Sequence, residues 1–394
     1  MTRIHDRIAS ARRIVIKIGS ALLFDPVRGE ARKGWMRALA RDVAILRTQG
    51  AQVVLISSGS IALGRRHLGL TAQSIRLEEK QAAAATGQVE LAQLWSEALA
   101  EEGVRAGQIL LAPDDTETRR RHINARATIT TLLDLGVVPV VNENDTVTTY
   151  EIRFGDNDRL AARVAAMISA DLLILLSDVD GLYTENPHRS ETAQHIADIP
   201  EITSEILAMG GDANAEFASG GMATKLSAAR IASGAGVGMI ICKGVDPQPI
   251  SGLMADAKCS FFHPQTTLIK ARKSWIAGAL DPKGTITVDA GAQSALRQGK
   301  SLLPVGITAI AGQFDRGDLV VIVCESGQEL GHGLAGYSSA EATKLKGQKS
   351  TDFAGILGYE CRAELIHADD LVLHHDQSDG HDKQPNTEQN NGGV

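Results

Sequence analysis

The sequence contains few cysteines, and their positions argue against two kinds of site. Four occur among 394 residues, and none forms a CxxC pair or lies near a histidine at a spacing that suits zinc. A disulfide framework and a zinc knuckle are therefore not indicated, and we expect no metal site built from protein side chains. We expect reduced, buried thiols at Cys242, Cys259, Cys324 and Cys361.

The sequence also lacks long apolar runs and an excess of positive charge. Its first twenty residues, MTRIHDRIASARRIVIKIGS, contain no stretch that resembles a signal peptide. No segment approaches the roughly 20 apolar residues that cross a bilayer. We therefore expect a cytoplasmic protein with no membrane partner. The net charge of −7 gives no general reason to expect nucleic acid as the main partner.

The chain does contain a regular alternation of apolar and helical segments. Its 394 residues, 43% of them hydrophobic, allow two or three domains. Residues 82–101 and 157–169 have helical patterns between short apolar runs. Near-continuous apolar strands separated by helices favour a parallel, doubly wound α/β sheet. The expected strands lie within 13–19, 51–59, 107–112, 136–145, 171–181 and 237–244.

The pattern changes in the last third of the chain. We expect an α/β domain over residues 1–265 and a linker over 266–283. From Gly284 to about residue 375, short β-like runs separated by turn glycines predict a small, mostly β domain. Residues 376–394 are polar and are expected to be a disordered tail.

Three loops rich in small residues follow or precede these elements. Lys17, near the end of the first strand, is followed by Gly19 and Ser20, and residues 57–60 read SSGS. Residues 217–226, FASGGMATKL, have Gly, Ala or Ser at five of ten positions before and around a single lysine, Lys225. None of the three loops is a Walker A motif. Small residues allow backbone N–H groups to approach a phosphate, and the lysines supply compensating charge. Phosphoryl transfer is the chemistry that such a pattern suits.

Asparagine and aspartate gather between these loops. Such clusters are commonly turns and helix caps, but residues 142–147 (NENDTV) and 154–165 (FGDNDRLAARVA) are close together in the sequence. Asn142, Asp145 and Asn157 offer acceptors for an ammonium group and donors for a carboxylate, which are the needs of an amino acid. Asp158 is placed to order the lysines or a metal-bound phosphate.

Taken together, these motifs resemble the bacterial glutamate 5-kinases of the amino-acid kinase family, with a C-terminal PUA domain. The resemblance covers residues 11 to about 375. It implies an amino-acid kinase fold, with a mainly parallel sheet between helices, and a mostly-β PUA domain. The motifs that carry it are VIKIGS, SSGSIALGRRHLG, KQAAAATGQ, NARATI, VVPVVNENDTV, FGDNDRLAARVA, LLSDVDGLYT and GGMATKLSAA.

The resemblance implies ATP-dependent phosphorylation of the γ-carboxylate of L-glutamate, the first step of proline synthesis, with Mg²⁺ on the nucleotide. Lys17, Lys225 and Asp158 would be catalytic, the two lysines balancing charge and the aspartate orienting them. Ser58, Asp145 and Asn157 would bind glutamate. The ATP-binding residues would be Lys17, Ser177, Asp178, Ser219, Gly220, Gly221, Met222, Ala223, Thr224 and Lys225.

The resemblance also implies partners and leaves alternatives. It implies inhibition by proline, a homo-oligomer that is a dimer or a tetramer, and a γ-glutamyl phosphate reductase that consumes the product. A sibling kinase acting on aspartate, acetylglutamate, carbamate or a nucleotide monophosphate is one alternative. An RNA-associated protein is another, because PUA domains elsewhere bind RNA. Residues 281–375, however, hold eight Lys or Arg against twelve Asp or Glu, a net charge of −4 that gives RNA binding no support.

Overall fold

The computed structural model describes residues 3–25, 27–72, 75–148, 157–187, 189–211, 221–277 and 282–374. The chain divides into two compact units, Met1–Arg272 and Lys273–Val394. A helix, α12 (Leu268–Ala277), occupies much of the predicted linker over 266–283. The domain boundaries read from the sequence remain predictions, and the predicted tail lies outside the described residues.

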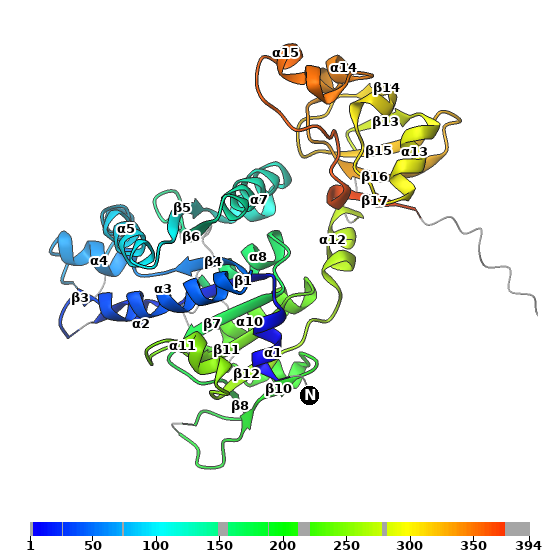
Figure 1. Cartoon of the computed structure of the whole chain (residues 1–394). Helices are drawn as coiled ribbons and strands as arrows, with labels where there is room; N and C mark the ends of the chain where they lie inside the picture. The colour runs from blue at the N-terminus through cyan, green and yellow to red at the C-terminus, as the bar shows by residue number, and fades with distance from the viewer. Residues whose placement is uncertain are drawn as a thin grey trace, which may run out of the picture. The chain divides into compact units, whose positions relative to one another are not determined.

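The first unit is built on one eight-stranded sheet with the order β10-β12-β11-β7-β1-β4-β6-β5 (Figure 1). The six strands from β11 to β5 run parallel to one another, and the sequence predicted all six. Two strands of this sheet were not predicted from the sequence. They are β12, which runs antiparallel to β11, and β10, which has two residues. The strands are β1 (Arg13–Ile18), β4 (Gln52–Ser57), β5 (Arg105–Leu111), β6 (Val137–Glu143), β7 (Leu172–Ser177), β10 (Asp198–Ile199), β11 (Gly238–Lys243) and β12 (Cys259–Phe262), with small hairpins β2 (Phe24–Asp25) and β3 (Glu30–Ala31), β8 (Leu182–Tyr183) and β9 (His195–Ile196).

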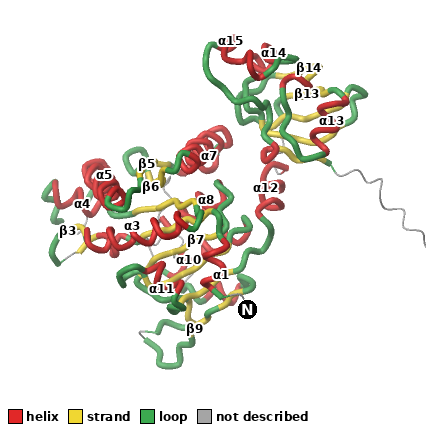
Figure 2. The backbone as a smooth tube through the Cα atoms, viewed as in Figure 1, coloured by secondary structure: helices red, strands yellow, loops and turns green. Residues whose placement is uncertain are grey.

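Helices cover both faces of this sheet (Figure 2). Side chains of a strand alternate between its faces, so Ile14 and Ile16 of β1 pack in one core and Val15 packs in the other. Helices α3, α5 and α11 contribute to the first core, and α7, α8 and α10 contribute to the second. The helices are α1 (Ile4–Ser10), α2 (Ser20–Leu23), α3 (Lys33–Thr48), α4 (Ser60–His67), α5 (Leu77–Ala100), α6 (Pro113–Glu117), α7 (Arg119–Asp134), α8 (Asn157–Met167), α9 (Ser204–Ala208), α10 (Met222–Gly234) and α11 (Pro249–Met254).

The second unit has a five-stranded sheet of order β14-β13-β15-β16-β17. Ile286, Val320 and Phe353 are among the buried side chains of its separate core. The unit is β-rich, as predicted, and it also contains short helices. Its elements are β13 (Gly284–Val288), α13 (Ala290–Arg297), η2 (Pro304–Gly306), β14 (Ile307–Gly312), β15 (Leu319–Cys324), β16 (Glu329–Leu334), α14 (Ser339–Leu345), η3 (Ser350–Asp352), α15 (Phe353–Leu357), η4 (Ala368–Asp370) and β17 (Leu371–Leu373).

The cysteines are free thiols, and three of the four are buried, whereas Cys361 is half-buried. Cys242 on β11 and Cys259 on β12 are direct partners in the antiparallel register. Burial raises the pKa of Cys259 to about 11 and raises the pKa of Cys242 further, so both stay protonated at neutral pH. Among the described residues, no helix is long and apolar enough to span a membrane.

Two glycines allow α4 and α5 to touch backbone to backbone. A Cβ on Gly87 of α5 would lie 1.9 Å from the carbonyl oxygen of Ser60, and one on Gly64 of α4 would lie 1.7 Å from that of Ala83. Rigid backbone atoms cannot move aside as the end of a flexible side chain can. The contact therefore fixes the start of α4, and with it the loop that follows β4.

This contact predicts that Gly87→Ala destabilises the protein by about 1–3 kcal/mol, the usual cost of overpacking. Gly34→Ala on α3 is the matched control, because no atom lies within 4 Å of the position that its Cβ would take. Alanine favours a helix over glycine, so the control should have unchanged or slightly higher stability. Urea unfolding followed by tryptophan fluorescence measures both variants. Equal midpoints for the two would show that the close contact is unimportant.

Candidate active site

The candidate site lies at the carboxyl ends of the central parallel strands. β1 pairs with β4 on one side and with β7 on the other. The strands that follow β1 in the sequence, β4, β5 and β6, lie on one side of it, and the later strands β7 and β11 lie on the other side. The direction in which strands are added to the sheet therefore reverses at β1. Ligands of open α/β sheets bind at such a reversal, beyond the carboxyl ends of the strands.

Asp158 forms the centre of this site, between two lysines. Its Oδ1 lies 2.5 Å from Lys17 Nζ, and its Oδ2 lies 3.2 Å from Lys225 Nζ. Thr224 Oγ1 lies 3.2 Å from Asp158 Oδ2 and 2.9 Å from the carbonyl oxygen of Gly221. Asp158 is fully buried, and the two lysines are 6% and 7% exposed. The three residues predicted as catalytic therefore come together in one cluster.

Strand alternation and small side chains bring this cluster together. Lys17 is two residues after Val15 on β1, so it lies on the face of the sheet that α8 and α10 cover. The two helices pack against each other and place several small alanines in one core, which suits a close approach of their backbones. Asp158 in the first turn of α8 and Lys225 in the first turn of α10 then meet over β1. The packed alanines are Ala161, Ala162 and Ala165 on α8 and Ala228, Ala229 and Ala232 on α10.

The charges of the lysines determine the ionisation of Asp158. Burial by itself would raise the pKa of this carboxyl group, but Lys17 and then Lys225 outweigh burial and hold the pKa below its ordinary value. Asp158 is therefore an anion at neutral pH. Lys17 and Lys225 also line the cavity beside Asp158, where their ammonium groups can contact an anionic part of a ligand.

A second polar network joins the loops after β4 and β6 to α8. Asn157 Nδ2 lies 2.7 Å from Ser58 Oγ, 3.0 Å from Asn142 Oδ1 and 3.2 Å from the carbonyl oxygen of Ser57. Asn142 Nδ2 in turn lies 2.8 Å from Gln88 Oε1 and 3.3 Å from Ser60 Oγ. These amides and hydroxyls are held in place by one another, so their remaining polar groups are oriented before a ligand arrives.

A cavity of about 640 Å³ connects the lysine cluster to the amide network. This volume is within the range of small-molecule sites. The start of α10 opens toward it with Gly221 as N-cap, at a φ of 131° that favours glycine, and no side chain caps this end in the described part of the chain. Exposed N–H groups at a helix start suit a phosphate. The cavity is lined by Lys17, Gly19, Ser20, Ala21, Leu22, Ser58, Gly59, Ser60, Ile61, Ala62, Arg65, Asn142, Glu143, Asp145, Asn157, Leu176, Ser177, Asp178, Gly221 and Lys225.

The other predicted site residues that the structure describes lie at the end of β7, around the cavity and at the start of α10. Ser177 ends β7, and its hydroxyl donates to Asp178 Oδ1 at 2.9 Å. Both residues line the cavity, as do Ser58 and Asp145. Met222, Ala223 and Thr224 form the first turn of α10 but are not lining residues. Ser219 and Gly220 lie outside the described residues.

The sequence analysis did not identify some residues that support the site. Gln88 holds Asn142 from α5, and the indole of Trp95 donates to Ser57 Oγ at 2.8 Å. The motif KQAAAATGQ contained Gln88 and Gly87, but a glutamine on an alanine-rich helix gives no signal of its partner. Glu143 and Arg65 also line the cavity and were not predicted.

The cluster predicts that Asp158→Asn lowers the free energy of unfolding at pH 7 by about 3 kcal/mol, because two buried ammonium groups lose their carboxylate. The difference from the parent should shrink in acid. A carboxylate with a depressed pKa stabilises the fold above its unfolded pKa, about 3.9, and this contribution is lost as the pH falls through the folded pKa. Denaturant unfolding at pH 7, 5 and 3 measures the effect.

Asp178→Asn is the matched control for this experiment. Asp178 lines the same cavity but is exposed, so its replacement should change stability by less than about 0.5 kcal/mol. If Asp158→Asn lowered the free energy of unfolding no more than Asp178→Asn does, Asp158 would not be the charge that organises the cluster.

Known proteins resemble this chain over nearly its whole length. The sequence model of the amino acid kinase family matches residues 12–243, and that of the PUA domain matches residues 284–357. The chain is 53% identical over 373 residues to glutamate 5-kinase 1 of Rhizobium meliloti (strain 1021), covering 95% of each chain. It is 54% identical over 367 residues to glutamate 5-kinase of Gluconobacter oxydans (strain 621H), covering 93% of this chain and 97% of that one. It is 51% identical over 366 residues to glutamate 5-kinase of Paramagnetospirillum magneticum (strain ATCC 700264 / AMB-1), covering 93% and 99%. The family resemblance and the fold class predicted from the sequence are confirmed.

Proposed function

The chain belongs to the amino acid kinase family, and from this premise we propose that it phosphorylates the γ-carboxylate of L-glutamate with ATP. The observation that carries the proposal is the Asp158 cluster, which presents two ammonium groups to a cavity lined by groups that suit an amino acid. The product is L-glutamyl 5-phosphate, from which proline is made. The high identity to glutamate 5-kinases over nearly all of the chain favours glutamate over the substrates of sibling kinases.

The triphosphate of ATP would lie against the lysines and the start of α10. Lys17 and Lys225 contact the phosphate oxygens, and N–H groups after Gly221 donate to them. We assign Ser177, Asp178 and residues 219–224 to the nucleotide as well. Asp158 touches both lysines and keeps their ammonium groups aimed at the oxygens whose charge grows during transfer.

The amino-acid half of the site would be the network at the ends of β4 and β6. Asp145 and the side-chain oxygen of Asn157 accept from the ammonium group of glutamate, while the hydroxyl of Ser58 donates to a carboxylate. Asn142 is buried and holds Asn157 in place at 3.0 Å. Glutamate bound in this way extends its γ-carboxylate toward the lysines.

The reaction then needs positioning and charge more than proton transfer. A γ-carboxylate oxygen of glutamate bonds to the γ-phosphorus of ATP, the bond from that phosphorus to the β,γ-bridging oxygen breaks, and ADP leaves. A carboxyl group with a pKa of about 4.3 is already an anion at neutral pH, so no general base is required. The lysines offset the repulsion between this anion and the phosphates.

Mg²⁺ is part of the proposal as the ion carried by ATP. It neutralises part of the triphosphate charge when bound. The exposed carboxylate of Asp178, at the end of β7 beside the cavity, is the oxygen donor that would hold it. Asp158 is already engaged by both lysines.

Proline is proposed as an inhibitor that competes with glutamate. It has the same α-carboxylate and an α-ammonium group, so Asp145 and Asn157 would bind it in the same place. We also propose a homo-oligomer, and a γ-glutamyl phosphate reductase as the next enzyme, because an acyl phosphate hydrolyses and cyclises readily. RNA binding by the second unit has no support from its charge, and we do not propose it.

The proposed reaction predicts glutamate-dependent release of ADP from Mg-ATP. Hydroxylamine should trap the acyl phosphate as a hydroxamate, and proline should suppress its formation in competition with glutamate. Aspartate and N-acetylglutamate are the control substrates, because one has a shorter side chain and the other lacks the ammonium group. Turnover with a control substrate that exceeds turnover with glutamate would point to a sibling kinase instead.

The lysine assignment predicts that Lys225→Met lowers kcat by about 10²–10³, the effect of losing one contact made in the transition state. Methionine keeps the length of the side chain and removes the charge. Lys270→Met is the matched control, an exposed lysine on α12 that does not line the cavity. Steady-state kinetics with glutamate and Mg-ATP compares the two. A Lys225→Met enzyme as active as the Lys270→Met enzyme would exclude Lys225 from the mechanism.

A further inference from the structure

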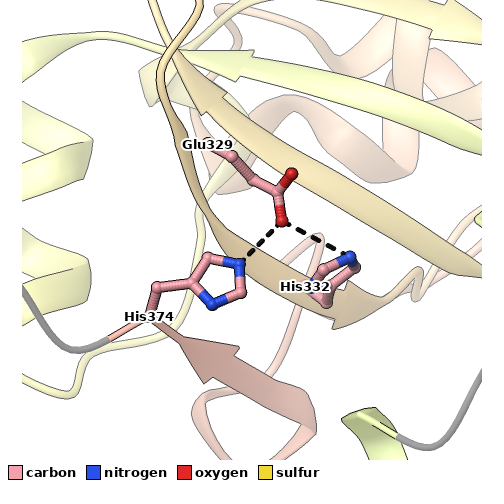
Figure 3. Close-up of side chains that lie close together, drawn as sticks. All are labelled: Glu329, His332 and His374. Carbon is pink, nitrogen blue, oxygen red and sulfur yellow. Dashed lines mark hydrogen bonds and ion pairs between the residues drawn. The ribbon is translucent and has the colours of Figure 1, made fainter.

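One group of side chains in the second unit lies apart from the kinase chemistry. Glu329, His332 and His374 gather on the sheet, with the carboxylate of Glu329 directed toward both imidazole rings (Figure 3). Glu329 Oε1 lies 2.7 Å from His374 Nε2 and 3.6 Å from His332 Nε2. One donor atom from each residue falls within 4.8 Å of the other two.

A β-bulge places Glu329 and His332 on the same face of β16. Residues three apart on a regular strand point to opposite faces. Here the register with β15 shifts between Ile322 and Val323, because Ile322 pairs with Gly331 while Val323 pairs with Glu329. The extra residue reverses the alternation, as bulges do when they redirect a side chain.

Gly331 makes this bulge possible. Its φ is 155°, and a Cβ at this position would lie 2.1 Å from the carbonyl oxygen of Val372 on β17. The backbones of β16 and β17 are therefore in direct contact beside the cluster. Any other residue at position 331 would separate the strands and the three side chains.

His374 reaches the cluster from the residue after β17. Its backbone N–H donates to the carbonyl oxygen of Leu330 at 2.9 Å, which extends the pairing of β16 with β17. The rings of His332 and His374 meet edge to face with centroids 5.5 Å apart. Three potential ligands thus come from two neighbouring backbones that hydrogen bonds hold in register.

We propose that Glu329, His332 and His374 bind a divalent transition-metal ion of the zinc class. Two imidazoles and one carboxylate are a common protein ligand set for zinc, with water in the fourth position. Ligand atoms about 2.0–2.2 Å from one tetrahedral ion lie about 3.3–3.6 Å apart, so an ion would widen the 2.7 Å contact of Glu329 with His374 and draw the more distant donor atoms together. Glu329 and His374 are partly exposed and can turn, and His332, the most buried of the three, sets the position of the ion.

The ion would connect the end of β17 to β16. β17 is a three-residue edge strand that pairs only with β16 among the described strands. A ligand shared by the two strands adds a cross-link where the backbone pairing is short. Metal binding to the folded form also raises its stability.

Titration of the full-length protein with Zn²⁺ tests the proposal. The protein should carry no affinity histidines and should first be stripped with a chelator and dialysed. Competition with a chromophoric chelator should give one equivalent of bound zinc. His332→Ala, His374→Ala and Glu329→Gln should each weaken binding at least about tenfold. Zinc should raise the Tm of the parent and leave that of His332→Ala unchanged.

Two controls separate this site from other histidines. His367→Ala removes a half-exposed histidine of the same unit outside the cluster and should bind zinc as the parent does. Replacing both His375 and His381 by alanine tests the histidines that follow in the sequence, and it should also leave binding intact. Circular dichroism checks the fold, and His332→Gln replaces His332→Ala if the latter unfolds. Absence of stoichiometric zinc in the parent, or unchanged affinity in the folded His332 variant, would overturn the proposal.

Discussion

The contact of Asp158 with Lys17 and Lys225 is the interaction on which the rest of the first unit depends. Removing three charged groups from water is costly unless each finds a partner, and here one carboxylate serves two ammonium groups. Both lysines also line the cavity, so the cluster that Asp158 stabilises presents two ammonium groups to a ligand that enters it.

This constraint accounts for features of the surrounding sequence that otherwise look unrelated. Lys17 must lie on the same face of β1 as Val15, and α8 and α10 must approach closely enough for their first turns to meet over it. Several small, buried alanines on both helices suit the second condition. A larger side chain at the fully buried Ala161 or Ala228 would overpack this core and disturb the contact of Asp158 with the lysines. Packing one helical turn from the charged groups thus supports their geometry.

Much of this could be predicted from the sequence, for physical reasons that differ between elements. Buried parallel strands are continuous apolar runs, so β1, β4, β5, β6, β7 and β11 were evident, whereas the two residues of β10 cannot form a detectable pattern. Lys17, Asp158 and Lys225 were predicted as one group, because small residues beside both lysines suit a phosphate, Asp158 could order the lysines, and the family resemblance implied a joint catalytic role. The partnership of Asn142 with Gln88 was not predictable, since it joins a strand end to a helix middle through packing alone.

The histidine cluster shows a further limit of reading sites from spacing. Metal motifs found in sequences place ligands a few residues apart, on one turn of helix or in one loop. Glu329 and His332 are three residues apart. On a regular strand this spacing directs two side chains to opposite faces, so the pair would not be read as two ligands of one metal ion. His374 is more than forty residues away in the sequence yet adjacent in the sheet. Only the bulge at Gly331 makes the first pair compatible, and only the register of β17 adds the third. Sites of this kind follow from irregularities in strand pairing, so they become visible once the positions of bulges are known.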